Sequence, residues 1–297
     1  MRPVLLCEPN ISEGKDLLLV ERVLDRVRAV AGVKILDVSS DADHNRSVFT
    51  YLGDPLQVLA ATEALAAEAV GLIDMRLHHG SHPRMGAIDV VPFIPVRGLT
   101  NSEAIEIARR FGMYLGALGV PVYYYEEAAT RPERRLLPDI RKGQYEALEV
   151  KMRNPLWAPD EGPSEFNPRA GATVTGVRFP LVAFNVNLRS TDVGIAERIA
   201  RSVRNTNGGL RHVRAIGLAL EELGQVQVSM NLVNYLETPI PRVLEMVRSE
   251  AARYGVAVAG AELVGPLPMG ALEEVVKHYL QAHDFRMEQI IETALLD

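Results

Sequence analysis

Cysteine is scarce in this sequence: Cys7 is the only one among 297 residues. A single cysteine can form no disulfide within the chain and cannot build a cysteine-based metal site. The chain also lacks an uncharged apolar run of 18 residues, and the apolar run before Glu8 is too short for a signal peptide. We therefore expect a cytoplasmic, soluble protein.

Positive charge is also in short supply, with 32 Lys and Arg against 38 Asp and Glu and a net charge of -6. Nucleic acids and membrane surfaces are polyanionic, so we expect neither as a partner. Hydrophobic residues make up 47% and charged residues 24% of the chain, which is typical of a globular protein. The length allows two modest domains.

The apolar periodicity predicts the order strand, helix, strand, strand, helix, strand twice. In the first copy, strands are expected near 3–8, 33–39, 47–52 and 87–96, and helices near 16–30 and 55–72. In the second copy, strands are expected near 181–188, 211–220, 225–232 and 256–264. The helices of the second copy are expected to start near 192 and to span 239–254. This is the split βαβ order. We therefore predict an α+β fold, an α/β sandwich of two ferredoxin-like subdomains, 1–178 and 179–297, whose mixed sheets face each other around a ligand cleft.

Five further segments lie outside this repeated order. Thr100 and Glu103 form a capping-box signature for a helix that ends near Gly119, and a strand is expected at 121–125. Residues 126–172 lose regular alternation, and a segment of that length is either functional or a linker. Two helices are expected near 272–281 and 285–295.

The loop before the strand at 87–96 contains three of the seven histidines, His78, His79 and His82. They are surface polar residues, metal ligands or acid–base groups. Gly80 and Pro83 break the helix that would bring two of them to one face, so we expect no metal site. A histidine can take and return a proton near neutral pH, and Pro83 stiffens the backbone at His82.

Other loops offer candidates for substrate contacts. Arg84 could clamp a carboxylate, or it could form a weak surface ion pair. Residues 10–14 could offer backbone N–H groups to an anion, or form an ordinary turn. The aromatic residues of the segment 126–172 could hold a flat ligand, or the segment could be a linker. The predicted substrate contacts are Asn10, Ser12, Asn45, Arg46, His79 and Arg84.

Five strings together resemble the glutamate formimidoyltransferase family. They are CEPNISEG, DADHNRSVFTYLG, LIDMRLHHGSHPRMGAIDVVPFIPVRG, WAPDEGPSEFNPRAGATVTG and FNVNL. The resemblance spans nearly the whole chain, and HPRMGAIDV is its most specific block. It implies a folate-dependent enzyme of histidine degradation with two α/β subdomains around the folate. The expected reaction transfers a formimino group from N-formimino-L-glutamate to the co-substrate tetrahydrofolate, which gives 5-formiminotetrahydrofolate and L-glutamate.

The resemblance also implies residue roles. The family's catalytic histidine corresponds to His82, and its folate-binding stretch corresponds to Pro163, Ser164, Glu165, Phe166, Asn167, Pro168, Arg169, Ala170, Gly171 and Ala172. A homodimer is expected, because family members are often dimers or larger. The cyclodeaminase that is fused to the animal members is not expected in this chain.

Ser39 departs from the family pattern, which commonly has Asp in the DVDS string where this sequence has DVSS. If that Asp orients the histidine or the substrate, then Asp37, Asp41 or Asp43 must serve here, or the donor differs. Two alternatives therefore stay open. One is formyl transfer from N-formylglutamate to tetrahydrofolate, and the other is a folate-binding protein without catalytic activity.

Overall fold

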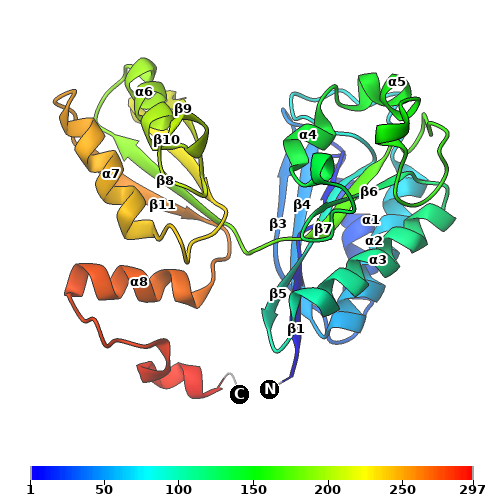
Figure 1. Cartoon of the computed structure of the whole chain (residues 1–297), viewed down its shortest axis with the longest axis horizontal. Coiled ribbons are helices and arrows are strands. Elements are labelled where there is room, and N and C mark those ends of the chain that lie inside the picture. The colour runs from blue at the N-terminus through cyan, green and yellow to red at the C-terminus, as the bar shows by residue number, and fades with distance from the viewer. Residues whose placement is uncertain (1, 296–297) are drawn as a thin grey trace. The chain divides into compact units, whose positions relative to one another are not determined.

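The computed structural model describes residues 2–295, and the chain divides into two compact units between Arg178 and Phe179. Each unit contains one β-sheet with helices packed against it (Figure 1). The α+β fold class expected from the sequence is confirmed. Among the described residues, no helix is both long and apolar enough to cross a membrane.

The N-terminal unit is built on a seven-stranded sheet. Its strands are β1 (Val4–Cys7), β2 (Asn10–Ile11), β3 (Lys34–Asp41), β4 (Arg46–Gly53), β5 (Ile88–Arg97), β6 (Val122–Glu126) and β7 (Thr173–Val177), and its helices of five or more residues are α1 (Leu17–Arg28), α2 (Pro55–Leu72), α3 (Asn101–Ala117), α4 (Leu137–Arg141) and α5 (Leu148–Met152). β1 and β2 follow each other between β4 and β5, and β3 pairs with the outer side of β4. These pairings are antiparallel and give the split βαβ order, which β7 and β6 extend in parallel to β5.

The helix starts of this unit follow from local sequence. The Asp16 carboxylate accepts hydrogen bonds from the first backbone N–H groups of α1, and Asp54 does the same for α2, where Pro55 occupies the first turn. Thr100 and Glu103 form the predicted capping box at α3. These caps hold the helices at defined points beside the sheet.

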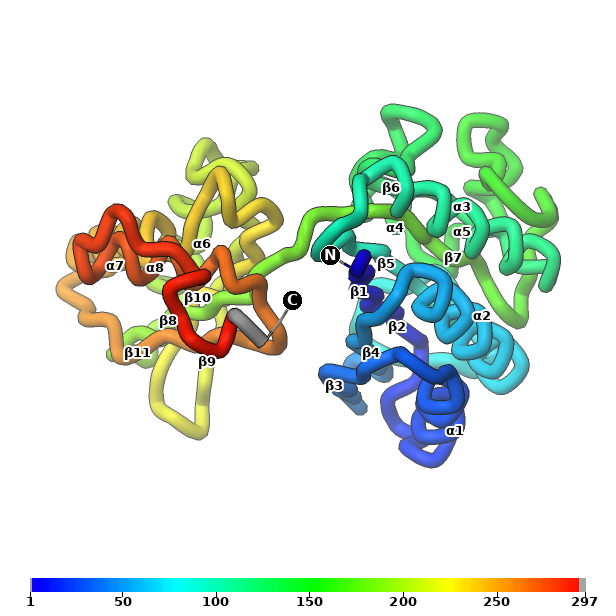
Figure 2. Tube along the Cα trace, turned by 90° about the horizontal axis from the view of Figure 1, so that it is seen from below, coloured from blue at the N-terminus to red at the C-terminus, as the bar shows by residue number. Residues whose placement is uncertain are grey.

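Helices α1, α2 and α3 lie side by side on one face of the N-terminal sheet (Figure 2). Phe49 and Tyr51 of β4 point into this core, together with Phe93 of β5. Side chains alternate along a strand, so Arg46 of β4 lies on the opposite face of the sheet. Its backbone lies opposite that of Asp41 in the pairing of β3 with β4. There, the segment between β6 and β7 covers β5, β7 and β6 with a smaller apolar cluster that includes Tyr123.

The C-terminal unit has a four-stranded sheet in the order β11-β8-β10-β9. Its elements are β8 (Val182–Leu188), α6 (Val193–Val203), β9 (Val213–Leu220), β10 (Gln225–Leu232), α7 (Ile240–Ala252), β11 (Val258–Val264) and α8 (Met269–Leu280). The side chains of β8 and β10 that point to α6 and α7 are apolar, whereas the opposite face carries an amide-rich row. In that row Gln227 donates to Asn187, and Asn185 donates to Glu262.

Four sequence expectations need correction. The strands β2 and β7 were missed, because β2 has only two residues and β7, Thr-Val-Thr-Gly-Val, lacks apolar alternation. The last helix, expected near 285–295, is instead the 3₁₀ turns Met287–Gln289 and Ile291–Leu295, where Ile291 is 88% exposed and has no core to pack on. The N-terminal sheet is mixed as expected, whereas every pairing of the C-terminal sheet is antiparallel. That the sheets face each other stays a prediction.

A buried arginine holds the segment between β6 and β7 in place. The Arg134 side chain is 0% exposed, and its Nη1 lies 3.0 Å from Asp160 Oδ1. Its Nη2 donates to the carbonyl oxygens of Leu156 at 2.7 Å and Ala158 at 2.6 Å. Its guanidinium also lies near the rings of Tyr123 and Trp157, at 5.3 and 5.9 Å from their centroids. These contacts add to the apolar packing that holds this segment on the sheet.

We expect Arg134→Ala to lower the free energy of unfolding by about 3–5 kcal/mol, because it leaves the Asp160 carboxylate buried without its partner. The neighbouring Arg135→Ala is the matched control, since its ion pair with Glu127 is exposed and is worth less than about 1 kcal/mol. Urea unfolding followed by the fluorescence of Trp157, the only tryptophan, measures both. Equal midpoints for the two variants would contradict this role of Arg134.

Candidate functional site

His82 lies on the loop between α2 and β5, and the loop is held by backbone contacts to two other segments. Met75 N–H donates to the carbonyl of Arg169 at 2.9 Å, and Ala87 N–H donates to that of Ala170 at 2.8 Å. On the other side, Ser81 N–H donates to the carbonyl of Asp43 at 3.2 Å. Segments distant in sequence therefore fix the path of the loop around His82.

The His82 ring is half-buried and contacts Arg46. Nη1 of Arg46 lies 2.7 Å from Nε2 of His82. A guanidinium only donates, so Nε2 accepts this bond and the proton of the neutral ring is on Nδ1. Nδ1 is buried without a hydrogen bond of good geometry, although the backbone of Pro83 slightly favours the charged ring.

Burial is the main reason that the pKa of His82 is lowered to about 3, and positive neighbours add to it. These neighbours are Arg46 on β4, Arg141 at the end of α4, and His44 in the turn between β3 and β4. The ring of His44 lies 6.0 Å from that of His82, edge to face. His82 is therefore neutral in the free protein near pH 7.

Asp89 connects Arg141 to the loop that carries His82. Its carboxylate is almost fully buried, accepts the Met85 N–H at 2.9 Å and pairs with Nη2 of Arg141. Burial raises the pKa of Asp89, while Arg141 and the Met85 N–H oppose this. The pair therefore fixes one positive guanidinium close to the imidazole.

Asp41 holds His44 on the outer side of His82. The Asp41 carboxylate accepts the backbone N–H of His44 at 2.8 Å and lies 2.6 Å from Nδ1 of its ring. The bond from the backbone of His44 is the main reason that the pKa of Asp41 is lowered. Ser39 is an exposed residue of β3 that pairs with Val48. Asp37, Asp41 and Asp43 were the candidates to replace the Asp expected at position 39. Of these, Asp41 is the one whose carboxylate contacts His44, beside His82.

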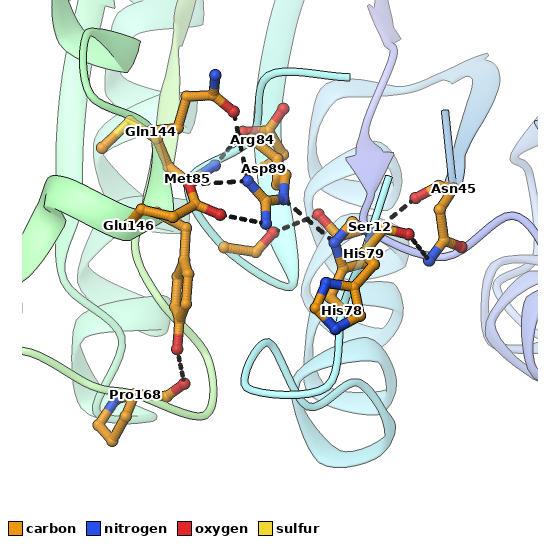
Figure 3. Close-up of polar contacts among 12 residues, drawn as sticks. Ser12, Asn45, His78, His79, Arg84, Met85, Asp89, Gln144, Glu146 and Pro168 are labelled. Carbon is orange, nitrogen blue, oxygen red and sulfur yellow. Dashed lines mark hydrogen bonds and ion pairs between the residues drawn. The ribbon is translucent and has the colours of Figure 1, made fainter. Parts of the chain in front are cut away.

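Arg84 lies between His78 and Glu146 rather than pointing to open space (Figure 3). Its Nε donates to Nδ1 of His78 at 3.1 Å, and its terminal nitrogens contact Glu146 at 2.6 and 3.0 Å. Since Nδ1 of His78 accepts, Nε2 donates to the carbonyl of Asn45 at 2.9 Å. Burial first, and Arg84 next, lower the pKa of His78. This arrangement favours a structural role for Arg84; a substrate contact stays a prediction.

Asn10, Ser12, Asn45 and His79, predicted to bind substrate, lie in the loops around this network. Asn45 has φ 49°, accepts the Gly14 N–H at 3.0 Å and donates to the carbonyl of His79 at 3.0 Å. Ser12 donates to the carbonyl of Gly86 at 2.7 Å, and Asn10 to that of Glu8 at 2.9 Å. Three of these side chains are buried and hold loops together, whereas His79 is exposed. Their substrate contacts stay predictions.

The predicted folate stretch, 163–172, has a buried end and an exposed part. Ala170, Gly171 and Ala172 are buried, and Ala172 N–H donates to the carbonyl of Met85 at 3.0 Å. The half-buried ring of Phe166 lies 5.5 Å from that of Tyr145. The side chains left exposed are Ser164, Glu165, Pro168 and Arg169. The stretch thus runs from the surface to the loop that carries His82.

Among the described residues, no three His, Cys, Asp or Glu side chains are grouped so that they could hold a metal ion. Burial raises the pKa of Cys7 to about 12, which makes it a poor nucleophile. Two hollows, of about 500 and 330 Å³, lie in the C-terminal unit and include none of the predicted site residues. The candidate site is the polar cluster around His82, to which Arg46, Arg141 and Asp89 belong.

Comparison with known proteins identifies the family of the chain. Residues 4–178 match the N-terminal subdomain of the formiminotransferase domain, and residues 183–295 match the formiminotransferase domain. The chain belongs to the formiminotransferase family. Glutamate formimidoyltransferase of Streptococcus pyogenes is 44% identical over 298 residues and 100% of both chains.

Two further relatives extend the comparison. The enzyme of the same name from Thermoplasma acidophilum is 44% identical over 96% of this chain and 95% of its own. Formimidoyltransferase-cyclodeaminase of Rattus norvegicus is 43% identical over 94% of this chain and 53% of its own length. The resemblance noted from the sequence is therefore confirmed for the family.

The sequence pointed to His82 and Arg46 but not to Arg141, which the structure places in the same candidate site. Arg141 ends a helix of five residues in the irregular segment, 52 residues after its partner Asp89. The buried aspartate in the HPRMGAIDV block was the available signal, because a buried carboxylate requires a positive partner. Which arginine supplies it depends on tertiary packing.

We expect the His82 ring to stay neutral between pH 5 and 8 in the free protein, because its pKa is about 3. The unfolded chain binds this proton near pH 6.5, so the part of the stability due to His82 falls as pH drops from about 6.5 towards 3. Ring ¹⁵N shifts, assigned with His82→Gln, measure the titration. A midpoint near 6.5 would contradict the role of the flanking arginines.

Proposed function

We propose that this chain transfers the formimino group of N-formimino-L-glutamate to tetrahydrofolate, which gives 5-formiminotetrahydrofolate and L-glutamate. The observation that carries this proposal is the 44% identity to two glutamate formimidoyltransferases, over 100% and 96% of the chain. The neutral imidazole of His82, set among positive side chains, supports it. Tetrahydrofolate acts as a co-substrate and leaves with the one-carbon unit.

The chemistry requires a proton to move between two nitrogens. N5 of the reduced pterin attacks the amidine carbon of the donor, and N5 must then lose its proton. The bond from the amidine carbon to the glutamate nitrogen breaks, and this nitrogen must gain a proton. A neutral His82 takes the first proton and delivers the second, so one side chain serves both steps.

Positioning contributes the larger share of the rate enhancement, because two substrates must meet in one geometry. Holding them as near neighbours is worth on the order of 7–11 kcal/mol in well-oriented reactions. The loop contacts at Ser81 and Ala87 limit the motion of His82. In this proposal the exposed part of residues 163–172 contacts the folate, while its buried end supports the histidine loop.

Formyl transfer from N-formylglutamate is a second candidate, and Ser39 is the observation that favours it. Ser39 offers a neutral hydroxyl at an exposed position of β3, where the family commonly has Asp. An amidine can carry a positive charge and attracts a carboxylate, whereas a formyl group is neutral. A folate-binding protein without turnover is the third candidate, and it predicts binding without release of glutamate.

Mixing the protein with tetrahydrofolate and each donor separates these candidates. We expect glutamate release with N-formimino-L-glutamate to exceed release with N-formyl-L-glutamate. The opposite order would replace the proposed donor, and no release with either donor would leave only folate binding.

His82→Ala should lower kcat by about 100-fold or more, the usual worth of an acid–base group, with a smaller change in KM. His283→Ala is the control, because His283 is exposed in the C-terminal unit. If the two variants had the same kcat, His82 would not be the base.

A further inference from the structure

Two arginines beside His82 have buried N–H groups that no partner satisfies. Nε of Arg46 and Nε of Arg141 are both buried without a hydrogen bond. Such groups are rare in folded proteins, because an unpaired buried donor costs about 1–3 kcal/mol. Arg134 also has two such nitrogens, but its guanidinium lies 3.0 Å from a carboxylate and donates to two carbonyl oxygens. Arg46 contacts only the neutral ring of His82, so a ligand beside His82 can supply the acceptor that Arg46 lacks.

Arg46 also lacks a carboxylate partner. Arg141 pairs with Asp89, but Arg46 forms no ion pair with a carboxylate among the described residues and contacts the neutral ring of His82 instead. Burial is the main reason that the pKa of Arg46 is lowered, and Arg141 lowers it further. The carboxylate of Asp41, which lies opposite Arg46 across β3 and β4, contacts His44 instead. A ligand carboxylate would give Arg46 the ion-pair partner that it lacks while accepting from both guanidiniums.

We propose that Arg46 and Arg141 bind the α-carboxylate of the amino-acid donor. This inference rests on the proposed function, because it takes the donor to be an N-substituted glutamate. The leaving nitrogen and the α-carboxyl carbon are both bonded to Cα, which puts them about 2.5 Å apart. A carboxylate held by these arginines therefore brings the leaving nitrogen next to the ring that must protonate it.

Binding in this way also frees the base. In the absence of ligand, Nη1 of Arg46 donates a hydrogen bond to Nε2 of His82 at 2.7 Å, so Nε2 is not available to accept a proton. A carboxylate is a stronger acceptor for a guanidinium than a neutral imidazole, because the bond joins two opposite charges. The donor thus draws Arg46 away from Nε2, and His82 can accept a proton only when the donor is present.

Two stable analogues test the carboxylate assignment without any transfer reaction. N-acetyl-L-glutamine keeps the α-carboxylate and lacks the γ-carboxylate. N-acetyl-L-isoglutamine keeps the γ-carboxylate and lacks the α-carboxylate. In titrations of the full chain, we expect N-acetyl-L-glutamine to shift the His82 ring ¹⁵N signals and raise the His82 pKa. N-acetyl-L-isoglutamine should do neither. Equal effects of the two analogues, or no effect of either, would overturn the proposal.

Variants then assign the binding to the two arginines. Arg46→Met should weaken N-acetyl-L-glutamine binding about 10- to 100-fold by calorimetry, the worth of a hydrogen bond between charged groups. Arg141→Lys keeps a positive partner for the buried Asp89, so that folding is preserved, and should weaken binding by losing the planar fork. The exposed neighbour Lys142→Met is the control. Unchanged affinity in Arg46→Met would overturn the assignment.

These outcomes are separable from the proposed transfer activity. Selective binding of N-acetyl-L-glutamine at Arg46, with no glutamate release from N-formimino-L-glutamate, would support this site and refute the activity. Glutamate release that is unaffected by Arg46→Met would support the activity and refute this site.

Discussion

The buried carboxylate of Asp89 is the point on which the candidate site depends. It accepts the Met85 N–H from the loop that carries His82, and it pairs with Arg141 from the segment between β6 and β7. A carboxylate 1% exposed is tolerated only when paired, so the two segments cannot part without leaving a charge uncompensated. The same residue therefore sets the loop geometry and the positive surroundings of the imidazole.

Arginine has a repeated structural use in this unit. Arg84, Arg134 and Arg141 each join the segment between β6 and β7 to other parts of the unit or close it upon itself, through carboxylates and carbonyl oxygens. The planar fork of a guanidinium suits such contacts. The composition of the sequence could not indicate this use of arginine, because composition does not reveal burial.

Local sequence signals predicted most of the fold. The capping box at Thr100 and the alternating strands of both units appear where expected, because these features depend on neighbours in the chain. β7 and the packing of residues 126–172 depend on contacts with β5 and β6, which no local period encodes. The site divides in the same way. His82 and Arg46 were candidates from their loops, whereas the buried state of Arg84 and the approach of Arg141 arise only from tertiary contacts.

The proposed role of His82 as a base explains why the charged side chains around it matter for the chemistry. A base whose pKa is about 3 takes up a proton poorly at neutral pH, since general bases work best when their pKa is near the operating pH. Part of that depression comes from Arg46 and Arg141, and a bound anion cancels their effect on the ring. Burial of the ring still lowers the pKa of His82 when the anion is bound, so the protonated ring gives up its proton readily. A base that gains strength with the donor and then returns the proton to the leaving nitrogen suits a transfer between two nitrogens.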